Sequence, residues 1–286
     1  MLPSVPISGG SDALTRQSFV IFAKSQNTLR AKKSYGQHFL TNEKYAERIA
    51  DSLRLTDQYD TVFEVGPGQG MLTKYLLDRS YTLKVIEADD DMVDYLYDHY
   101  PSLAPNVIRG NFLRVPLEQH AEGQFGLIGN YPYNISSQIL IKTIDYRDRI
   151  PEMVGMFQKE VADRTVAPPG SKTYGVISVL VQAFYQTEYL FSVAPGNFNP
   201  PPKVQSAVIR LERLPDQELG VPYKLFRRVV KTAFGQRRKM LRNTMKSIIP
   251  NSERLKDPFF EQRPERLGVA EFVQLSRWIE EEIGND

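Results

Sequence analysis

Short apolar runs alternate with amphipathic stretches from Tyr59 onward. Apolar runs bounded by turn residues are typical of buried strands, whereas apolar positions three and four residues apart predict helices. The pattern predicts strands at 61–65, 82–86, 106–109 and 125–129, and helices at 71–79 and 92–99. This alternation favours an α/β fold in which helices wrap a parallel sheet.

The second half of the chain changes character after Arg213. Before that residue, the pattern predicts strands at 153–157, 188–192 and 206–211 and a helix at 174–185. After it, the pattern is helical, at 223–234, 237–248 and 270–283, and contains no convincing strand. Residues 214–221 resemble a linker, so we predict a Rossmann-like domain at 31–213 and a small all-helical domain at 214–286. Residues 1–30 are an N-terminal extension, with a short predicted helix at 12–24.

The composition is that of an ordinary soluble globular protein. Lys and Arg number 36 against 34 Asp and Glu, 41% of the 286 residues are hydrophobic, and no run approaches the roughly 18 apolar residues that span a bilayer. The absence of Cys excludes disulfides, thiolate metal sites and cysteine nucleophiles, and permits a cytoplasmic location. The three histidines, His38, His99 and His120, are far apart in sequence, so we expect no metal site. The lack of a long apolar run also leads us to expect no membrane association.

A glycine-rich turn follows the first predicted strand of the sheet. In the segment 63–70 (FEVGPGQG), Gly66 and Gly68 allow a tight turn and a close approach of the backbone to a ligand. A dinucleotide fingerprint would need a third glycine where Met71 stands, which argues against NAD. Glu87 ends the next strand, where a carboxylate can accept hydrogen bonds from both ribose hydroxyls. The combination predicts an adenosyl cofactor, although the glycines alone are also typical of a structural turn.

A polar and aromatic loop follows the strand at 125–129. The exocyclic amine of adenine is a poor nucleophile because its lone pair is delocalised, so an enzyme must aim acceptors at its two N–H groups. The Asn130 side-chain oxygen and a neighbouring main-chain carbonyl could serve, and no general base is needed. Pro132 would stiffen the loop, and Tyr133 offers an aromatic face for an extruded base, a contact worth roughly 1–3 kcal/mol. The alternative is an ordinary turn after a strand.

Charge is distributed unevenly along the chain. One stretch holds nine basic residues without an acidic one: Lys224, Arg227, Arg228, Lys231, Arg237, Arg238, Lys239, Arg242 and Lys246. We expect these groups on the outer face of helices interrupted at Gly235, either as a solvated surface or as a contact to nucleic-acid phosphates. The acidic cluster Asp89, Asp90, Asp91, Asp94 and Asp98 is interpreted as a solvated helix start and face.

Seven motifs in order resemble the ribosomal RNA small-subunit adenine dimethyltransferases, the kasugamycin-sensitivity family. They are 35–40 (YGQHFL), 64–68 (EVGPG), 85–87 (VIE), 130–136 (NYPYNIS), 158–162 (QKEVA), 198–204 (FNPPPKV) and 234–242 (FGQRRKMLR). The resemblance implies that S-adenosyl-L-methionine donates methyl groups to the N6 amines of two adjacent adenosines in the 3′-terminal hairpin of small-subunit (16S) rRNA. Each adenosine is methylated twice. The implied substrate is a late 30S assembly intermediate, and the free protein is expected to be a monomer.

The resemblance also implies roles for individual residues. His38 and Leu40 would close over the cofactor, Gly66 would line its amino-acid end, Gly68 would also bind it, and Glu87 would bind its ribose. Asn130 would bridge cofactor and target amine, with the main chain of Tyr131 and Pro132 beside it. Tyr133 and Phe198 would sandwich the target base. The basic residues Arg237, Arg238, Lys239 and Arg242 would grip rRNA phosphates, which position the substrate without reading its sequence.

Two positions depart from the family's usual pattern. Asn111 stands where the family commonly has an Asp that accepts a hydrogen bond from the cofactor's adenine, and its amide oxygen can still accept one. Tyr131 stands where Leu or Ile is usual, so its ring must be accommodated.

Other functions remain open on the sequence. One is a large-subunit rRNA adenine N6-methyltransferase of the same superfamily. Another is a small-subunit assembly or binding factor with weak catalysis, which Asn111 keeps open. A DNA adenine methyltransferase would usually show Pro-Pro directly after the Asp or Asn of this loop, where Tyr131 and Pro132 follow Asn130 here. It would also usually have a separate sequence-reading domain, which the sequence does not indicate.

Overall fold

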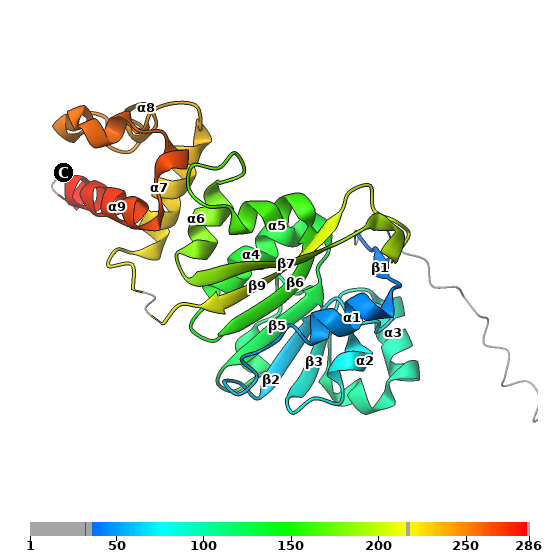
Figure 1. The fold of residues 1–286 in the computed structure, drawn as a ribbon. Helices are drawn as coiled ribbons and strands as arrows, with labels where there is room; N and C mark the ends of the chain where they lie inside the picture. The colour runs from blue at the N-terminus through cyan, green and yellow to red at the C-terminus, as the bar shows by residue number, and fades with distance from the viewer. Residues whose placement is uncertain (1–31, 33–35, 216–217, 285–286) are drawn as a thin grey trace, which may run out of the picture. The chain divides into compact units, whose positions relative to one another are not determined.

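The computed structural model describes residues 32, 36–215 and 218–284. The described residues form a seven-stranded sheet with helices on both faces, in the strand order β4-β3-β2-β5-β6-β9-β7 (Figure 1). The N-terminal extension and its predicted helix at 12–24 lie outside the described residues.

The sheet is parallel except at one edge. The parallel strands are β2 (Thr61–Val65), β3 (Thr82–Glu87), β4 (Val107–Arg109), β5 (Phe125–Asn130) and β6 (Glu152–Gln158). Strand β9 (Ser206–Arg213) pairs antiparallel with β6 and with β7 (Tyr185–Val193), so the prediction of a parallel sheet is wrong for these two strands. No α-helix lies between β7 and β9, and a parallel pairing of consecutive strands would need such a crossover.

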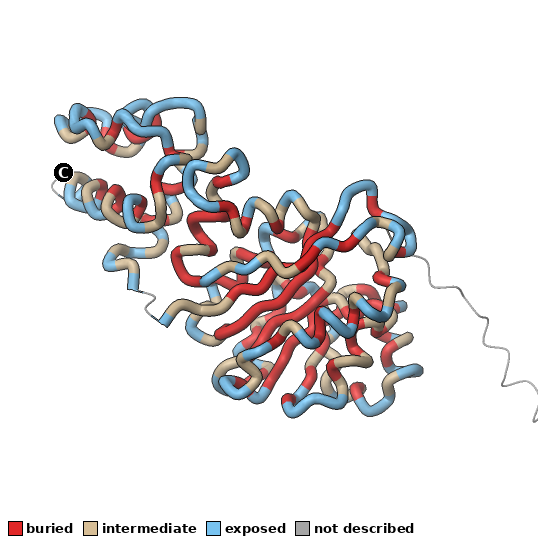
Figure 2. Tube along the Cα trace, in the orientation of Figure 1, coloured by how far each residue is buried: buried red, intermediate tan, exposed pale blue. Residues whose placement is uncertain are grey.

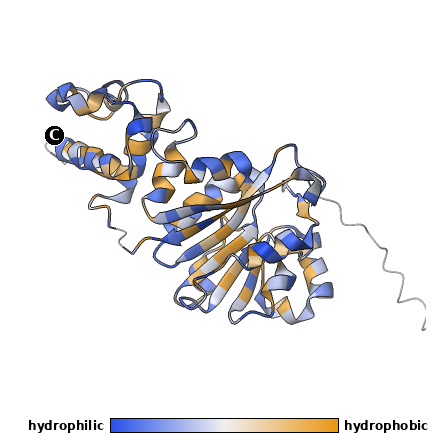
Figure 3. Ribbon diagram, in the orientation of Figure 1, coloured by the Kyte–Doolittle hydropathy of each residue, from blue (hydrophilic) through white to orange (hydrophobic). Residues whose placement is uncertain are grey.

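The central strands are buried on both faces. Every residue of β2 is buried, as is every residue of β5 except Asn130, and in Figure 2 these strands form a red band between two layers of helices. Figure 3 shows the same band as predominantly hydrophobic. Strands that are covered on both faces have nearly continuous apolar sequences, which explains why the positions of these strands could be predicted from the sequence.

Two hydrophobic clusters flank the sheet. On one face, α4 (Ser136–Asp145), α5 (Lys159–Val166) and α6 (Val176–Gln182) contribute to a cluster that continues into α7 (Tyr223–Gly235), α8 (Leu241–Met245) and α9 (Val269–Gly284). On the other face lie α1 (Glu43–Ala50), α2 (Thr73–Leu76) and α3 (Asp90–His99). The described residues after 213 are helical, as expected, and share a core with the sheet. The domain boundary itself stays a prediction.

Several predicted helices are shorter than expected, and three were not predicted. The predicted helices at 71–79, 174–185 and 237–248 are reduced to α2, α6 and α8, and α1, α4 and α5 were missed. Residues 236–240 form a turn, in which the Arg237 guanidinium donates to the main-chain oxygens of Lys172 at 2.6 Å and Ser171 at 3.0 Å. This tertiary contact accompanies a non-helical backbone where the apolar spacing alone predicted a helix. No helix in the described part of the chain is long and apolar enough to cross a membrane.

Candidate active site at the strand ends

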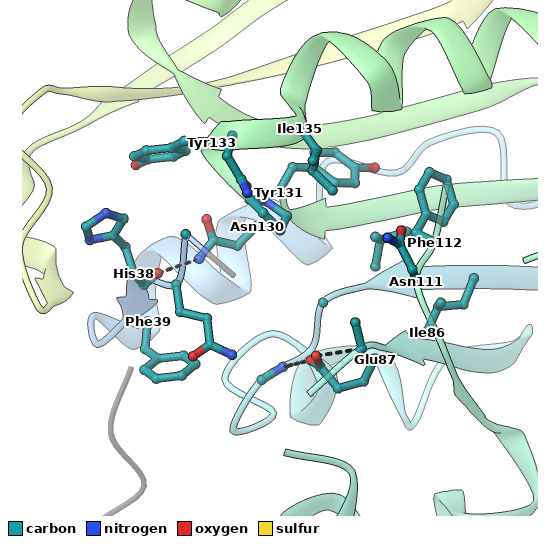
Figure 4. A pocket seen from close by; sticks show the side chains of 18 of the residues that line it. His38, Phe39, Ile86, Glu87, Asn111, Phe112, Asn130, Tyr131, Tyr133 and Ile135 are labelled. Atoms are coloured by element: carbon teal, nitrogen blue, oxygen red, sulfur yellow. Dashed lines mark hydrogen bonds between the residues drawn. The ribbon is translucent and has the colours of Figure 1, made fainter. Parts of the chain in front are cut away.

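One cavity lies where the carboxyl ends of four parallel strands meet. Strands β4, β3, β2 and β5 are neighbours in the sheet, so the residues that follow them converge at one edge. Gly66 follows β2, Glu87 ends β3, Asn111 follows β4 closely and Asn130 ends β5. All four line a cavity of about 240 Å³ (Figure 4). The structure therefore brings together residues that the sequence separates by up to 64 positions.

The glycine-rich turn forms one wall of this cavity. Gly66 and Gly68 have φ values of +68° and +54°, which residues with a side chain rarely adopt. A Cβ atom on Gly68 would also lie 2.8 Å from the Phe39 ring. The turn therefore requires glycine both for its backbone conformation and for space.

Glu87 presents a buried carboxylate to the cavity. Oε1 accepts from the N–H groups of Ala88 and Asp89 at 2.8 and 2.9 Å, and Oε2 accepts from Gly68 at 3.1 Å. A carboxylate has about four acceptor positions, so these bonds fix its orientation and leave Oε2 able to accept from a ligand hydroxyl. Burial raises the pKa of Glu87 above its ordinary value, although the three backbone N–H groups oppose this shift.

Asn111 lines the cavity, with Ile86 and Phe112 beside it (Figure 4). Its side-chain oxygen accepts from the N–H of Leu113 at 2.9 Å. The second lone pair of that oxygen remains for a ligand donor. Asn111 thus occupies the cavity, as predicted, and also stabilises its own turn.

Asn130 is oriented by the main chain of the N-terminal segment. Its side-chain nitrogen donates to the main-chain oxygen of His38 at 3.0 Å, and the dashed line in Figure 4 marks this bond. Because the nitrogen is held on one side, the amide oxygen is free to accept on the other. This is the geometry needed to hold an amino group of a substrate.

Two aromatic rings lie beside Asn130. The rings of His38 and Tyr133 stack with a centroid distance of 5.3 Å and an interplanar angle of 29°. His38 Nδ1 donates to the main-chain oxygen of Pro200 at 2.8 Å, and the Tyr133 hydroxyl hydrogen-bonds to Ser206 Oγ. His38 is therefore fixed against the segment that joins β7 to β9, and Tyr133 against the first residue of β9.

The structure shows how the ring of Tyr131, which stands where the family usually has Leu or Ile, is accommodated. The residue is 1% exposed, and its ring packs on Phe157 at a centroid distance of 4.9 Å within the hydrophobic core. Space for it exists because residue 155 is glycine, where any Cβ atom would overlap the ring. The buried ring leaves the main chain of Tyr131 as the part of this residue that can contact a ligand, and its role in the site stays a prediction.

Leu40 and Phe198 are neighbours on a separate two-stranded sheet, in which β1 (Phe39–Leu40) pairs with β8 (Phe198–Asn199). Leu40 lines an adjoining cavity of about 260 Å³, which shares Phe39, Gly66 and Asn130 with the first. Phe198 is 4% exposed and lines neither cavity. Its predicted stacking on a target base stays a prediction.

The four basic residues expected to bind RNA differ in their surroundings. Arg237 is engaged with the carbonyls of Ser171 and Lys172, and Arg242 forms an ion pair with Glu261 at 3.4 Å. Arg238 and Lys239 are exposed, and among the described residues neither has a side-chain hydrogen bond or ion pair. The latter two are therefore the better candidates for phosphate contacts.

The interpretation of Asp89 as part of a solvated helix start is wrong. Asp89 is completely buried, whereas Asp90, Asp91, Asp94 and Asp98 are exposed as expected. Its carboxylate binds Lys32 at 2.6 Å and Gln37 at 3.0 Å. Sequence reasoning missed both Asp89 and Gln37, because no local pattern distinguishes one acid in an acidic run or pairs it with a residue 52 positions away.

The adjoining cavity contains a second buried carboxyl, to which the sequence analysis assigned no role. Glu64 lies in β2, is 1% exposed, and accepts a hydrogen bond from the Thr73 hydroxyl at 2.7 Å. Burial raises the pKa of Glu64 to about 8. Within the described residues, no group of three or more His, Cys, Asp or Glu side chains is placed to hold a metal ion.

Comparison with solved structures shows the class of protein. The chain is similar to a dimethyladenosine transferase from Plasmodium falciparum, with 25% identity and a TM-score of 0.70 over 86% of this chain and 98% of that one. The fold and the cavity at the strand ends define a Rossmann-like methyltransferase. A family model described as ribosomal RNA adenine dimethylase matches residues 28–279, so the chain belongs to that family and is an rRNA-modifying enzyme.

Curated relatives agree across nearly the whole chain. "Ribosomal RNA small subunit methyltransferase A" of Flavobacterium johnsoniae is 52% identical over 253 residues, which cover 88% of this chain and 97% of the relative. The protein of the same name from Phocaeicola vulgatus is 49% identical over 259 residues, which cover 90% of this chain and 92% of that relative. The family predicted from the seven motifs is confirmed.

Proposed function

We propose that this protein uses S-adenosyl-L-methionine to dimethylate the N6 amines of two adjacent adenosines in the 3′-terminal hairpin of small-subunit rRNA. The substrate would be a late small-subunit assembly intermediate in the cytoplasm, to which the free protein binds as a monomer. The observation that supports this most is the convergence of Glu87 and Asn130 on one cavity. An acceptor for ribose and an acceptor for an amino group then lie within reach of one cofactor molecule.

The residues of the cavity fit an adenosyl cofactor. The carboxylate of Glu87 would accept from ribose hydroxyls, and Ile86 and Phe112 would contact the adenine ring. Asn111 would accept from the adenine's amino group as the usual Asp does, though without a charge. Gly66 and Gly68 would border the amino-acid end. When bound, this cofactor supplies a methyl group on a positively charged sulfur, which needs no further activation.

The target amine would be held by acceptors on two sides. The Asn130 side-chain oxygen and a main-chain carbonyl at 131–132 would accept its two N–H groups, and this draws the nitrogen lone pair out of conjugation with the ring. The cofactor would supply the methyl group as its carbon–sulfur bond breaks, and the methylated nitrogen would lose one proton to water. Because that proton is acidic after methylation, no general base is required. Tyr133 would stack on the base, a contact worth roughly 1–3 kcal/mol.

Binding of rRNA would rely on exposed basic residues after Gly235. Arg238 and Lys239 present charges without side-chain partners among the described residues, and Arg237 and Arg242 lie beside them. Such contacts neutralise phosphates and fix the orientation of the substrate. Shape and the surrounding ribosomal surface would then select the adenosines.

The test is transfer of labelled methyl groups to purified small subunits that lack the modification, followed by nucleoside analysis. Large subunits and duplex DNA serve as parallel substrates, and Asn130→Ala serves as the inactive control that still binds small subunits. We expect dimethyladenosine in small-subunit rRNA alone. Label in large-subunit rRNA would contradict the substrate assignment. Binding to small subunits without transfer would favour an assembly factor, and Asn111→Asp would then test whether the missing charge is responsible.

A further inference from the structure

Asp89 is a buried carboxylate beside the cavity, and the proposed function does not use it. It caps helix α3, since Oδ1 accepts from the N–H of Asp91 at 3.2 Å. Its own N–H donates to Oε1 of Glu87 at 2.9 Å. The main-chain N–H of Asp89 is therefore hydrogen-bonded to the carboxylate that is proposed to bind ribose.

Capping alone does not explain an aspartate at this position. Asn caps helices about as well as Asp, and a buried carboxylate is costly unless it is compensated. The compensation comes from far along the chain, because Lys32 Nζ lies 2.6 Å from Oδ1 and Gln37 Nε2 lies 3.0 Å from Oδ2. Gln37 is fixed further, since its Oε1 accepts from the Lys32 N–H at 2.8 Å. The charge of Asp89 thus matches two donors from the N-terminal segment.

The segment held by Asp89 leads directly to Asn130. Gln37 precedes His38, whose main-chain oxygen accepts from the Asn130 amide at 3.0 Å. Residues 36–39 and Asn130 line the same cavity, and Figure 4 shows Asn130 beside His38, joined to it by this hydrogen bond. The chain of contacts runs from Asp89 through Gln37 and His38 to Asn130.

We propose that Asp89 is a positioning residue for methyl transfer. By holding Gln37, it places the His38 carbonyl, which orients the Asn130 amide so that its oxygen meets the target amine. This inference rests on the proposed role of Asn130. A misplacement of about 1 Å in a reacting group can cost up to about a hundred-fold in rate. We expect loss of this anchor to lower kcat by about ten-fold while leaving the fold intact.

Asp89→Asn is the informative variant. It preserves the size and the helix cap, but an amide must turn its NH₂ group toward Lys32 or Gln37, and both are donors. The matched control is Asp91→Asn, because Asp91 also contacts Lys32 at 2.7 Å but is exposed and has no hydrogen bond to Gln37. At saturating cofactor and small subunits, kcat should fall about ten-fold in Asp89→Asn and in Gln37→Ala, and should stay within two-fold of wild type in Asp91→Asn.

The double variant separates positioning from stability. If Asp89 acts through Gln37, the combination Asp89→Asn with Gln37→Ala should lose no more kcat than either single variant, because both break the same link. If Asp89 only caps the helix, Asp89→Asn should leave kcat unchanged at temperatures well below its Tm. If Asp89 and Gln37 act independently, their two losses in kcat should multiply. Either of those results would overturn the proposal.

A second readout does not depend on the RNA substrate. The side-chain amide signal of Asn130, assigned by its loss in Asn130→Ala, should show one protected proton in the wild-type protein and in Asp91→Asn. In Asp89→Asn and Gln37→Ala, that protection should drop at least several-fold. Protection equal to wild type in Asp89→Asn would overturn the positioning role even if the enzyme proves to methylate another RNA. Absence of dimethyladenosine with the wild-type enzyme would instead overturn the proposed function.

Discussion

The ring of Tyr131 lies against the α-carbon of Gly155 on strand β6, where any larger residue would overlap it. Gly155 pairs with Gly129 on the neighbouring strand, and the ring fills the space that these two glycines leave open. The bulky side chain in the Asn130 loop is thereby turned into the core. The polar atoms of the loop stay on the cavity side.

The first prediction concerns this pair. Gly155→Ala should lower the free energy of unfolding by about 1–3 kcal/mol, because overpacking forces the ring or the strand to shift. Tyr131→Leu should cost about 2–4 kcal/mol through the cavity it leaves. The double variant should cost less than the sum, since each change relieves the other. Urea denaturation measures all three, and Gly196→Ala, with open space around it, is the control. Additive losses would contradict the packing described.

A second prediction concerns Glu87 and the cofactor. Glu87→Gln should weaken binding of S-adenosyl-L-methionine by about ten- to a hundred-fold, because hydrogen bonds to a charged group are worth about 1.5–3 kcal/mol. The new NH₂ group would also face a backbone N–H, since both oxygens of Glu87 accept from such groups. Calorimetric titration provides the affinity, with the exposed Asp94→Asn as control.

Cofactor binding should also depend on pH in a direction set by Glu87. Burial raises the pKa of this carboxyl, so it gains a proton at a higher pH than an ordinary glutamate does. A protonated carboxyl accepts less well, so affinity should fall as the pH is lowered toward that raised pKa. The Glu87→Gln variant should lack this decline. An affinity for the wild-type protein that rises on acidification would contradict the assignment.

The third prediction concerns Glu64 and stability. Burial raises the pKa of Glu64 to about 8, so the folded protein keeps this proton at neutral pH while the unfolded chain has lost it. Because the folded state binds more protons, this group makes stability fall as the pH rises from about 4.5 to about 8. Glu64→Gln can still accept from the Thr73 hydroxyl and should remove that decline. At pH 8 the free energy of unfolding of Glu64→Gln should therefore exceed that of the wild-type protein by about 1–3 kcal/mol.

Chemical denaturation across this pH range checks the prediction. For Glu122→Gln, a change at an exposed position, the plot of unfolding free energy against pH should run parallel to that of the wild-type protein. If the curve for Glu64→Gln also runs parallel, then Glu64 titrates alike in the folded and unfolded states, and its burial has no consequence for stability.

The fourth prediction separates two neighbouring arginines. Arg238→Glu should weaken binding to small subunits and reduce the slope of log affinity against log salt by about 1, with an unchanged Tm. Arg237→Glu should lower the Tm as well, because its guanidinium holds the carbonyls of Ser171 and Lys172. Filter binding at several salt concentrations and a thermal melt measure the two effects. Lys44→Glu, an exposed change on α1, is the control, and equal behaviour of all three variants would refute a specific basic contact.

The sequence by itself determined the parallel strands and the residues that follow them. Strand β2, the glycine turn and Glu87 were predictable because a strand covered on both faces is a continuous apolar run and because positive φ favours glycine. The carboxyl ends of such strands share one edge, so Gly66, Glu87 and Asn130 could be assigned to one site in advance. These inferences use only local patterns and one general rule of topology.

Only the tertiary structure decided the features that join distant parts of the chain. The burial of Asp89 depends on donors 52 and 57 positions away, and the place of the Tyr131 ring depends on a glycine on the next strand. The shortened α8 likewise accompanies contacts of Arg237 with the loop at 171–172. Local periodicity reports which face of an element is apolar, but it carries no information about which partner that face or side chain will meet. Packing between remote segments therefore set the orientation of Asn130, while the sequence set its identity.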